Sequence, residues 1–187
     1  MKAPATLLAI GLALAGCEAA TAPPAANRAA AAPAPAPPTA TDLPAQSGRV
    51  VDNAGLLTPA QEAGIEARLV TLEGRTTDQL VVVTTPSLGG RTIDQYGLAL
   101  GNHWHVGQRG KDNGVLLIVA PNEHQVRIEV GLGLEAILTN ARAGQIIQQS
   151  ILPQFRDNHY PEGIRAGSEA IIALLVAHAG EPRQRRS

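Results

Sequence analysis

The chain contains three apolar segments with the patterns of β-strands. Residues 80–84 and 115–119 are continuous runs dominated by Val, Leu and Ile, which is typical of strands buried on both faces. Residues 125–130 instead alternate polar and apolar side chains, which indicates a strand with one exposed face. Because only the turn 121–124 separates the last two segments, we expect them to pair antiparallel at one edge of a sheet. Residues 49–51 are a shorter fourth candidate.

Helical periodicity marks four further segments. Thr58 with Gln61, and Thr92 with Gln95, have the spacing of capping boxes at helix starts. Apolar residues then recur every three or four positions and share one helical face: Ile65, Leu69 and Leu72; Ile93, Tyr96, Leu100 and Trp104; Ala143, Ile146, Ile147 and Ile151; and Ile164, Ile171, Leu174 and Leu175. The pattern predicts an α/β fold, a three-layer α/β/α sandwich with a mixed sheet of about four strands.

The first residues show a different pattern. Lys2 precedes an apolar run over residues 5–15, which is typical of a secretory signal and too short to span a bilayer as a mature helix. The run ends in Leu-Ala-Gly-Cys, which resembles the lipobox of bacterial lipoproteins. The resemblance implies that residues 1–16 are a signal peptide and that Cys17 is lipidated after export. An ordinary signal peptide cut nearby is the alternative.

The segment that follows Cys17 is rich in Ala and Pro. Residues 17–47 contain almost no large apolar side chain, so they cannot bury enough surface to offset chain entropy. Pro-rich chains favour extended polyproline II and act as semi-rigid spacers. We therefore predict a linker over residues 17–47, a folded domain over residues 48–178 and a polar tail over residues 179–187. The expected location is the periplasm, with a lipid anchor in a bacterial membrane.

Composition narrows the possible functions. The 15 Lys and Arg residues against 16 Asp and Glu give a net charge of −1, without the basic excess of nucleic-acid-binding proteins. Cys17 is the single cysteine, which excludes an internal disulfide and a cysteine-based zinc site. The composition therefore predicts no nucleic-acid partner.

A glycine motif follows the alternating strand. Gly131, Gly133 and Ala136 have the G-x-G-x-x-A spacing of dinucleotide-binding loops. That fold also needs a following strand and an acidic residue about 20 positions later. Neither is found here, so we predict no nucleotide cofactor.

The predicted hairpin brings this glycine segment close to an acidic turn. If residues 121–124 close the hairpin, Val115 faces Val130, and residues 111–114 lie beside residues 131–135. Carboxylate and amide oxygens in such a place suit Ca²⁺ or Mg²⁺, and free N–H groups at a helix start suit a phosphate or carboxylate. Alternatively, Asp-Asn-Gly is ordinary turn chemistry, and the glycines only permit a bend.

The order of these segments resembles the TPM domain family, named for a thylakoid lumen protein, a photosystem II repair factor and a modulator of acetylcholine receptors. The matching blocks are VDNAGLLT at 51–58, QLVVVTTPSL at 79–88, WHVG at 104–107, KDNGVL at 111–116 and RIEVGLGLE at 127–135. The resemblance covers about residues 48–178. It implies a family whose founding members are described as acid phosphatases with bound calcium. Many bacterial relatives are membrane-tethered envelope proteins without an assigned activity.

Two functions follow from the resemblance. The first is a lipid-anchored accessory module that helps to assemble or maintain an envelope membrane-protein complex. The alternative is a metal-assisted acid phosphatase acting on phosphomonoesters, with Asp112 and Glu135 as catalytic residues and Asp52 and Asp112 as cation ligands. The ligand-binding candidates are Asn113, Gly131, Gly133 and Asn140, the last of which stands where relatives often have an aspartate.

Overall fold

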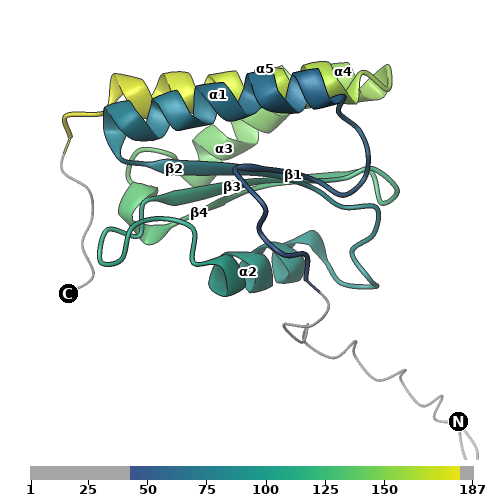
Figure 1. Cartoon of the computed structure of the whole chain (residues 1–187), viewed down its shortest axis with the longest axis horizontal. Helices are drawn as coiled ribbons and strands as arrows, with labels where there is room; N and C mark the ends of the chain where they lie inside the picture. The colour runs from purple at the N-terminus through teal and green to yellow at the C-terminus, as the bar shows by residue number, and fades with distance from the viewer. Residues whose placement is uncertain (1–42, 182–187) are drawn as a thin grey trace, which may run out of the picture. The chain divides into compact units, whose positions relative to one another are not determined.

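The computed structural model describes residues 43–181 (Figure 1). The predicted signal peptide, Cys17, most of the linker and residues 182–187 lie outside the described residues. Four strands form one mixed sheet in the order β1-β2-β3-β4: β1 is Val50–Asp52, β2 Gln79–Thr84, β3 Gly114–Ala120 and β4 Gln125–Val130. The first three strands are parallel, and β4 runs antiparallel to β3. The predicted fold class is confirmed.

The β3–β4 hairpin has the predicted register. Val115 pairs with Val130 at its open end, and Ala120 pairs with Gln125 beside the turn. β3 ends at Ala120 because the next residue, Pro121, has no N–H to continue the ladder. This register brings the chain before β3 next to the chain after β4.

The helices lie in two layers on the sheet. Both predicted capping boxes are present, at the starts of the first two helices. The helical elements are α1 Pro59–Thr76, α2 Ile93–Trp104, the 3₁₀ turn η2 Leu132–Leu134, α3 Asn140–Ile146, the π-helical η3 Ile147–Ile151, α4 Leu152–Arg156 and α5 Tyr160–Ala177. No helix within residues 43–181 is long and apolar enough to cross a membrane. The segment after β4 thus begins with a 3₁₀ turn, and Glu135 follows that turn rather than opening a helix.

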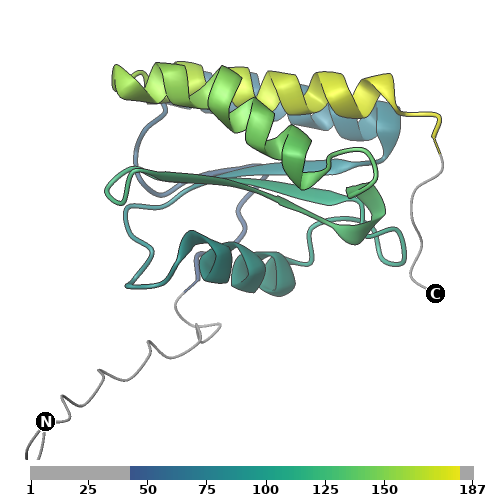
Figure 2. The ribbon, with the colours of Figure 1, turned by 180° about the vertical axis from the view of Figure 1, so that it is seen from behind.

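Alternation of side chains along the strands divides the core between the two faces. Val82 and Leu117 pack with Leu69 of α1 and Ile171 of α5 on one face. Leu116 and its neighbours pack against α2 on the other face. Figures 1 and 2 show α2 alone on its side of the sheet, with α1, α3, α4 and α5 opposite. Each fully buried Leu or Ile contributes about 1.5–3 kcal/mol, so both layers stabilise the sheet.

The chain before β1 also belongs to the packed part. Leu43 packs against the cluster between α2 and the sheet, and the carbonyl of Pro44 accepts a hydrogen bond from Trp104 Nε1 at 2.8 Å. The folded part therefore includes residues 43–47, which the sequence pattern had placed in the linker.

Glu123 connects the β3–β4 turn to the loop after β2. Its carboxylate accepts hydrogen bonds from the Leu88 N–H at 2.8 Å and from the Ser87 hydroxyl at 3.1 Å. The bond from the Leu88 N–H is the main cause that lowers the pKa of Glu123 below its ordinary value. A lowered carboxylate pKa stabilises the fold above the ordinary pKa, about 4.3, and this stabilisation is lost as the pH falls through the folded-state value.

We therefore expect Glu123→Gln to lower the free energy of unfolding at pH 7, and the difference from wild type to shrink as the pH falls below about 4. Urea unfolding of both proteins between pH 7 and pH 3 measures this difference. A difference that stays constant over that range would show that the Glu123 charge does not contribute to stability.

Candidate functional site

The turn before β3 and the glycine segment after β4 are in direct main-chain contact. The Gly131 N–H donates to the Gly114 carbonyl at 2.8 Å, and the Gly133 N–H donates to the Asp112 carbonyl at 3.0 Å. A Cβ at position 133 would lie 1.9 Å from the Lys111 carbonyl oxygen, and one at 131 would lie 2.2 Å from the Asp112 oxygen. Only glycine permits so close an approach of two backbones. The predicted juxtaposition of the two segments is confirmed.

This contact changes the role expected of the glycines. Both N–H groups already donate to main-chain carbonyls, and they are not the free donors that a phosphate or carboxylate needs. Gly131 and Gly133 hold the two segments together, which matches the structural alternative considered from the sequence.

Asn113 is part of the same framework. Its side chain is fully buried. Its Oδ1 accepts from the Gln108 N–H at 2.8 Å, and its Nδ2 donates to the Thr77 carbonyl at 2.8 Å and to Asp78 Oδ1 at 3.3 Å. These bonds tie the loop before β3 to the loop before β2. The Asn113 side chain therefore holds the two loops together and does not face a ligand.

Asp52 lies at the opposite end of the strands. It ends β1, where its carboxylate accepts hydrogen bonds from the Leu56 and Leu57 N–H groups at 3.1 and 2.8 Å and from the Thr84 hydroxyl. In the parallel register Asp52 aligns with Thr84, and Thr84 aligns with Val119. Asp112 instead lies before the start of β3, and the part of β3 between Gly114 and Val119 alone spans roughly 17 Å at about 3.3 Å per residue. The predicted cation site shared by Asp52 and Asp112 is therefore wrong.

The remaining carboxylates do not form a metal centre in this arrangement. Within residues 43–181 no group of three or more His, Cys, Asp or Glu side chains is placed to hold a metal ion. Ca²⁺ requires six to eight oxygen ligands, of which carboxylates are the strongest. The donors present do not fit that requirement, and the expected divalent cation stays a prediction of the sequence.

A groove lies between α2 and the end of β4, with a volume of about 360 Å³. Asp112, Glu129 and Glu135 line it together with Leu98 and Leu132. We call it the Asp112 groove. It brings together three predicted residues, Asp112, Gly131 and Glu135. Asn140 is the exposed first residue of α3 and does not line the groove.

The side chains of the Asp112 groove are both acidic and apolar. Glu129 pairs with Arg127, with Nε and Oε2 2.6 Å apart, and Arg127 also pairs with Asp94. Asp112 and Glu135 add two carboxylates beside this network. Leu98 and Leu132 are 59% and 42% exposed, and they are two of the three large apolar residues exposed in the described part of the chain. An acidic groove with exposed leucines suits a segment that offers both basic and apolar side chains.

Leu98 and Leu132 were not among the residues predicted from the sequence, although the sequence contains a signal for Leu98. Leu98 is apolar but lies off the buried stripe of its helix, which includes Tyr96 and Leu100. An apolar residue on the polar face of an amphipathic helix indicates a surface contact. Leu132 lies between two glycines, and only the structure shows that its side chain is exposed.

The fold and the groove define a small α/β domain with a preformed groove at the open end of the β3–β4 hairpin. The family model of the TPM domain matches residues 50–174, and the chain belongs to this family. No curated protein matches the chain.

Solved structures support the same fold. The N-terminal domain of a protein from P. gingivalis is 33% identical, with a TM-score of 0.66, and the match covers 74% of this chain and 88% of that one. The N-terminal domain of the cg2496 protein from Corynebacterium glutamicum is 16% identical, with a TM-score of 0.56 and coverage of 78% and 92%. The BA42 protein of Bizionia argentinensis is 19% identical, with a TM-score of 0.57 and coverage of 65% and 83%. The last two show likeness of fold alone.

Proposed function

We propose that the protein is a binding module of the bacterial cell envelope, anchored by a lipid on Cys17, which helps to assemble or maintain a membrane-protein complex. The observation that carries this proposal is the Asp112 groove, in which exposed leucines lie beside acidic side chains. Its partner is a segment of an envelope membrane protein that carries basic and apolar residues.

The exposure of Leu98 and Leu132 supports a contact surface. Soluble domains expose single apolar residues often, but apolar side chains that gather at a groove mark interaction sites. Because Leu98 and Leu132 are 59% and 42% exposed, burial of the rest of each side chain against a partner contributes roughly 1–2 kcal/mol. Both residues then add to the affinity, and complementary charges around them add specificity.

The rigidity of the groove supports the same conclusion. The bonds of Asn113 and the glycine contacts fix the loops that carry Asp112 and Leu132. A groove that is ordered before binding loses less entropy when a partner binds. The Ala- and Pro-rich composition of residues 17–47 suits a spacer between the lipid and this domain.

Affinity capture from detergent-solubilised membranes tests the proposal. Wild type is expected to recover a defined membrane partner, and Leu132→Asp is expected to weaken its capture at least ten-fold, because the change removes an apolar contact and adds a charge to an acidic groove. Val70→Asp is the matched control, since Val70 lies on α1 and is 48% exposed. Equal recovery by wild type and Leu132→Asp would contradict the proposal.

A second candidate is phosphomonoester hydrolysis, which is supported by the place of Asp112 and Glu135 in one groove. The surroundings of Asp112 speak against it, because the nearby glycine N–H groups are occupied and carboxylates repel phosphate. We therefore expect Asp112→Asn to hydrolyse a chromogenic phosphomonoester at the wild-type rate. Asn tolerates the left-handed backbone of position 112, φ +47°. An assay with Ca²⁺, Mg²⁺ or Mn²⁺ measures the rate. A large loss in both Asp112→Asn and Glu135→Gln would favour the phosphatase instead.

A further inference from the structure

A second cavity lies at the carboxyl end of β3, away from the Asp112 groove. Its volume is about 190 Å³, and its walls include Val119 of β3 and the side chains of Leu152 and Phe155 from α4. It shares no lining residue with the Asp112 groove. Ligands of open α/β sheets bind outside the carboxyl ends of the parallel strands, and this cavity occupies such a position.

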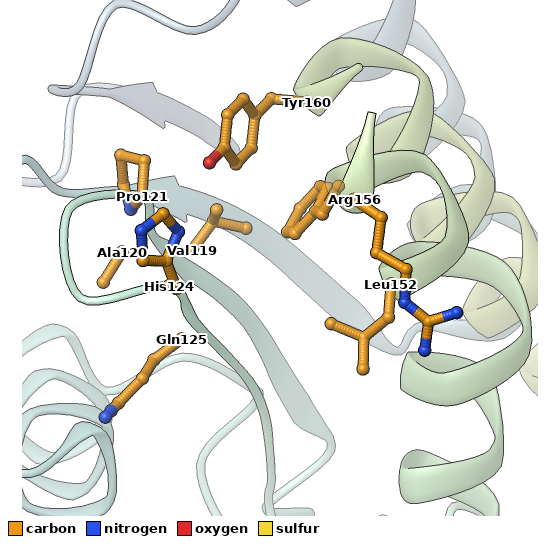
Figure 3. Close-up of a pocket in the computed structure, with 9 residues that line it drawn as sticks. Val119, Ala120, Pro121, His124, Gln125, Leu152, Arg156 and Tyr160 are labelled. Atoms are coloured by element: carbon orange, nitrogen blue, oxygen red, sulfur yellow. The ribbon is translucent and has the colours of Figure 1, made fainter. Parts of the chain in front are cut away.

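Four polar residues, His124, Gln125, Arg156 and Tyr160, line the cavity together with its apolar walls. Figure 3 shows the Tyr160 hydroxyl directed towards the β3–β4 turn, while His124 and Arg156 lie on opposite sides of the cavity. No Asp or Glu is among the residues that line it. The cavity therefore combines an apolar interior with hydrogen-bond donors and positive charge at its rim. That combination suits an anion with an apolar body.

The backbone around the cavity is unusual in two places. His124 has φ +52°, a left-handed conformation that few residues other than glycine adopt, and its N–H donates to the Pro121 carbonyl at 3.2 Å. The π-helical segment η3 ends at Ile151, immediately before Leu152, which lines the cavity. Such π-helical segments occur frequently at functional sites. Both features lie at the wall of the cavity.

Close packing holds the aromatic wall in place. A Cβ at Gly163 would lie 2.5 Å from the Phe155 ring, so the glycine in α5 makes room for that ring. The rings of Phe155 and Tyr160 are 4.9 Å apart and tilted by 50°, a favourable geometry for an aromatic pair. The cavity wall is thus fixed by the contact between α4 and α5.

We propose that this cavity binds a small monocarboxylate whose apolar body is about the size of one aromatic ring. A cavity of about 150 Å³ in another protein accepts benzene, and the present one is slightly larger. The apolar body lies against Leu152 and Phe155, and the carboxylate faces the rim beside the β3–β4 turn, near His124 and the Tyr160 hydroxyl. Arg156, on the opposite side, adds positive charge to the rim. This site is separate from the partner-binding surface and from its function.

Nuclear magnetic resonance titration of the purified protein with benzoate and hexanoate tests the proposal, with neutral benzamide and hexanol as matched probes. Both acids, at millimolar concentrations, are expected to shift the amide signals of Ala120, His124 and Gln125 with saturation, and the neutral probes are expected to bind several-fold more weakly. Arg156→Gln should weaken benzoate binding about two- to five-fold. Arg109→Gln removes the same charge from an exposed loop residue elsewhere and should leave binding unchanged.

Three results would overturn the proposal: neutral probes that bind as tightly as the acids, shifts that arise outside the cavity, or no saturable shift from either acid. The amide spectrum of Arg156→Gln also shows directly whether that variant is folded. Leu152→Trp, which fills the cavity from a half-buried position, supplies a second variant that should abolish benzoate binding. Capture of a membrane partner through Leu132 is measured separately, so either proposal can fail without the other.

Discussion

Replacement of Gly133 by alanine is expected to lower the free energy of unfolding by about 2–4 kcal/mol. The new Cβ would lie 1.9 Å from the Lys111 carbonyl oxygen, which is far inside van der Waals contact. The loop before β3 cannot move away without loss of the bond from the Gly133 N–H to the Asp112 carbonyl. The clash and the lost hydrogen bond therefore act together. Urea unfolding of the wild type and the variant measures the change.

Gly144→Ala is the matched control for this change. Gly144 lies within α3, and a Cβ there would meet nothing within 4 Å. Alanine in a helix interior is more favourable than glycine by roughly 0.5–1 kcal/mol, so this variant should be slightly more stable than wild type. If Gly133→Ala were as stable as Gly144→Ala, the close contact between the two loops would be contradicted.

Replacement of Asn113 by alanine is expected to cost about 3 kcal/mol. The substitution leaves the Gln108 N–H and the Thr77 carbonyl without the partners that the buried side chain provides. Each buried polar group that loses its partner costs about 1–3 kcal/mol. The loops that carry the Asp112 groove would lose their connection to the start of β2. Thermal or urea unfolding measures the loss, and partner capture is expected to weaken with it.

The control for Asn113 is Asn122→Ala in the β3–β4 turn. Asn122 is exposed and donates a single hydrogen bond, to the Pro86 carbonyl at 2.7 Å. An exposed bond contributes about 0.5–1.5 kcal/mol at most, so the Asn122 variant should retain most of the stability. Equal losses of unfolding free energy in the two variants would contradict the claim that the buried hydrogen bonds of Asn113 contribute more than the exposed one of Asn122.

The fold could be predicted because its signals are local. Continuous apolar runs identify β2 and β3, and alternation identifies β4 as the edge strand. The short turn then fixes the hairpin register, so that Val115 faces Val130 as expected. Spacing of Thr58 and Gln61 was enough to locate the start of α1, since a capping box depends on residues three positions apart.

The site could be predicted only in part, because it depends on contacts between distant segments. The error over Asp52 was one of topology: Asp52 is the last residue of β1, whereas Asp112 precedes β3, and in parallel strands these positions lie at opposite ends. The occupied N–H groups of Gly131 and Gly133 depend on distances between two main chains, which side-chain patterns do not encode. Asp112 and Glu135 were correctly placed together because the hairpin register decides their positions.

Site-specific photo-crosslinking in living cells tests most directly the proposal that the Asp112 groove binds an envelope partner. A photoreactive phenylalanine analogue in place of Leu98 or Leu132 should give the same defined crosslinked membrane protein, because both residues line one groove. The analogue in place of Val70, which is similarly exposed on α1, should not give that product. The same product from position 70, or none from positions 98 and 132, would contradict the proposed function.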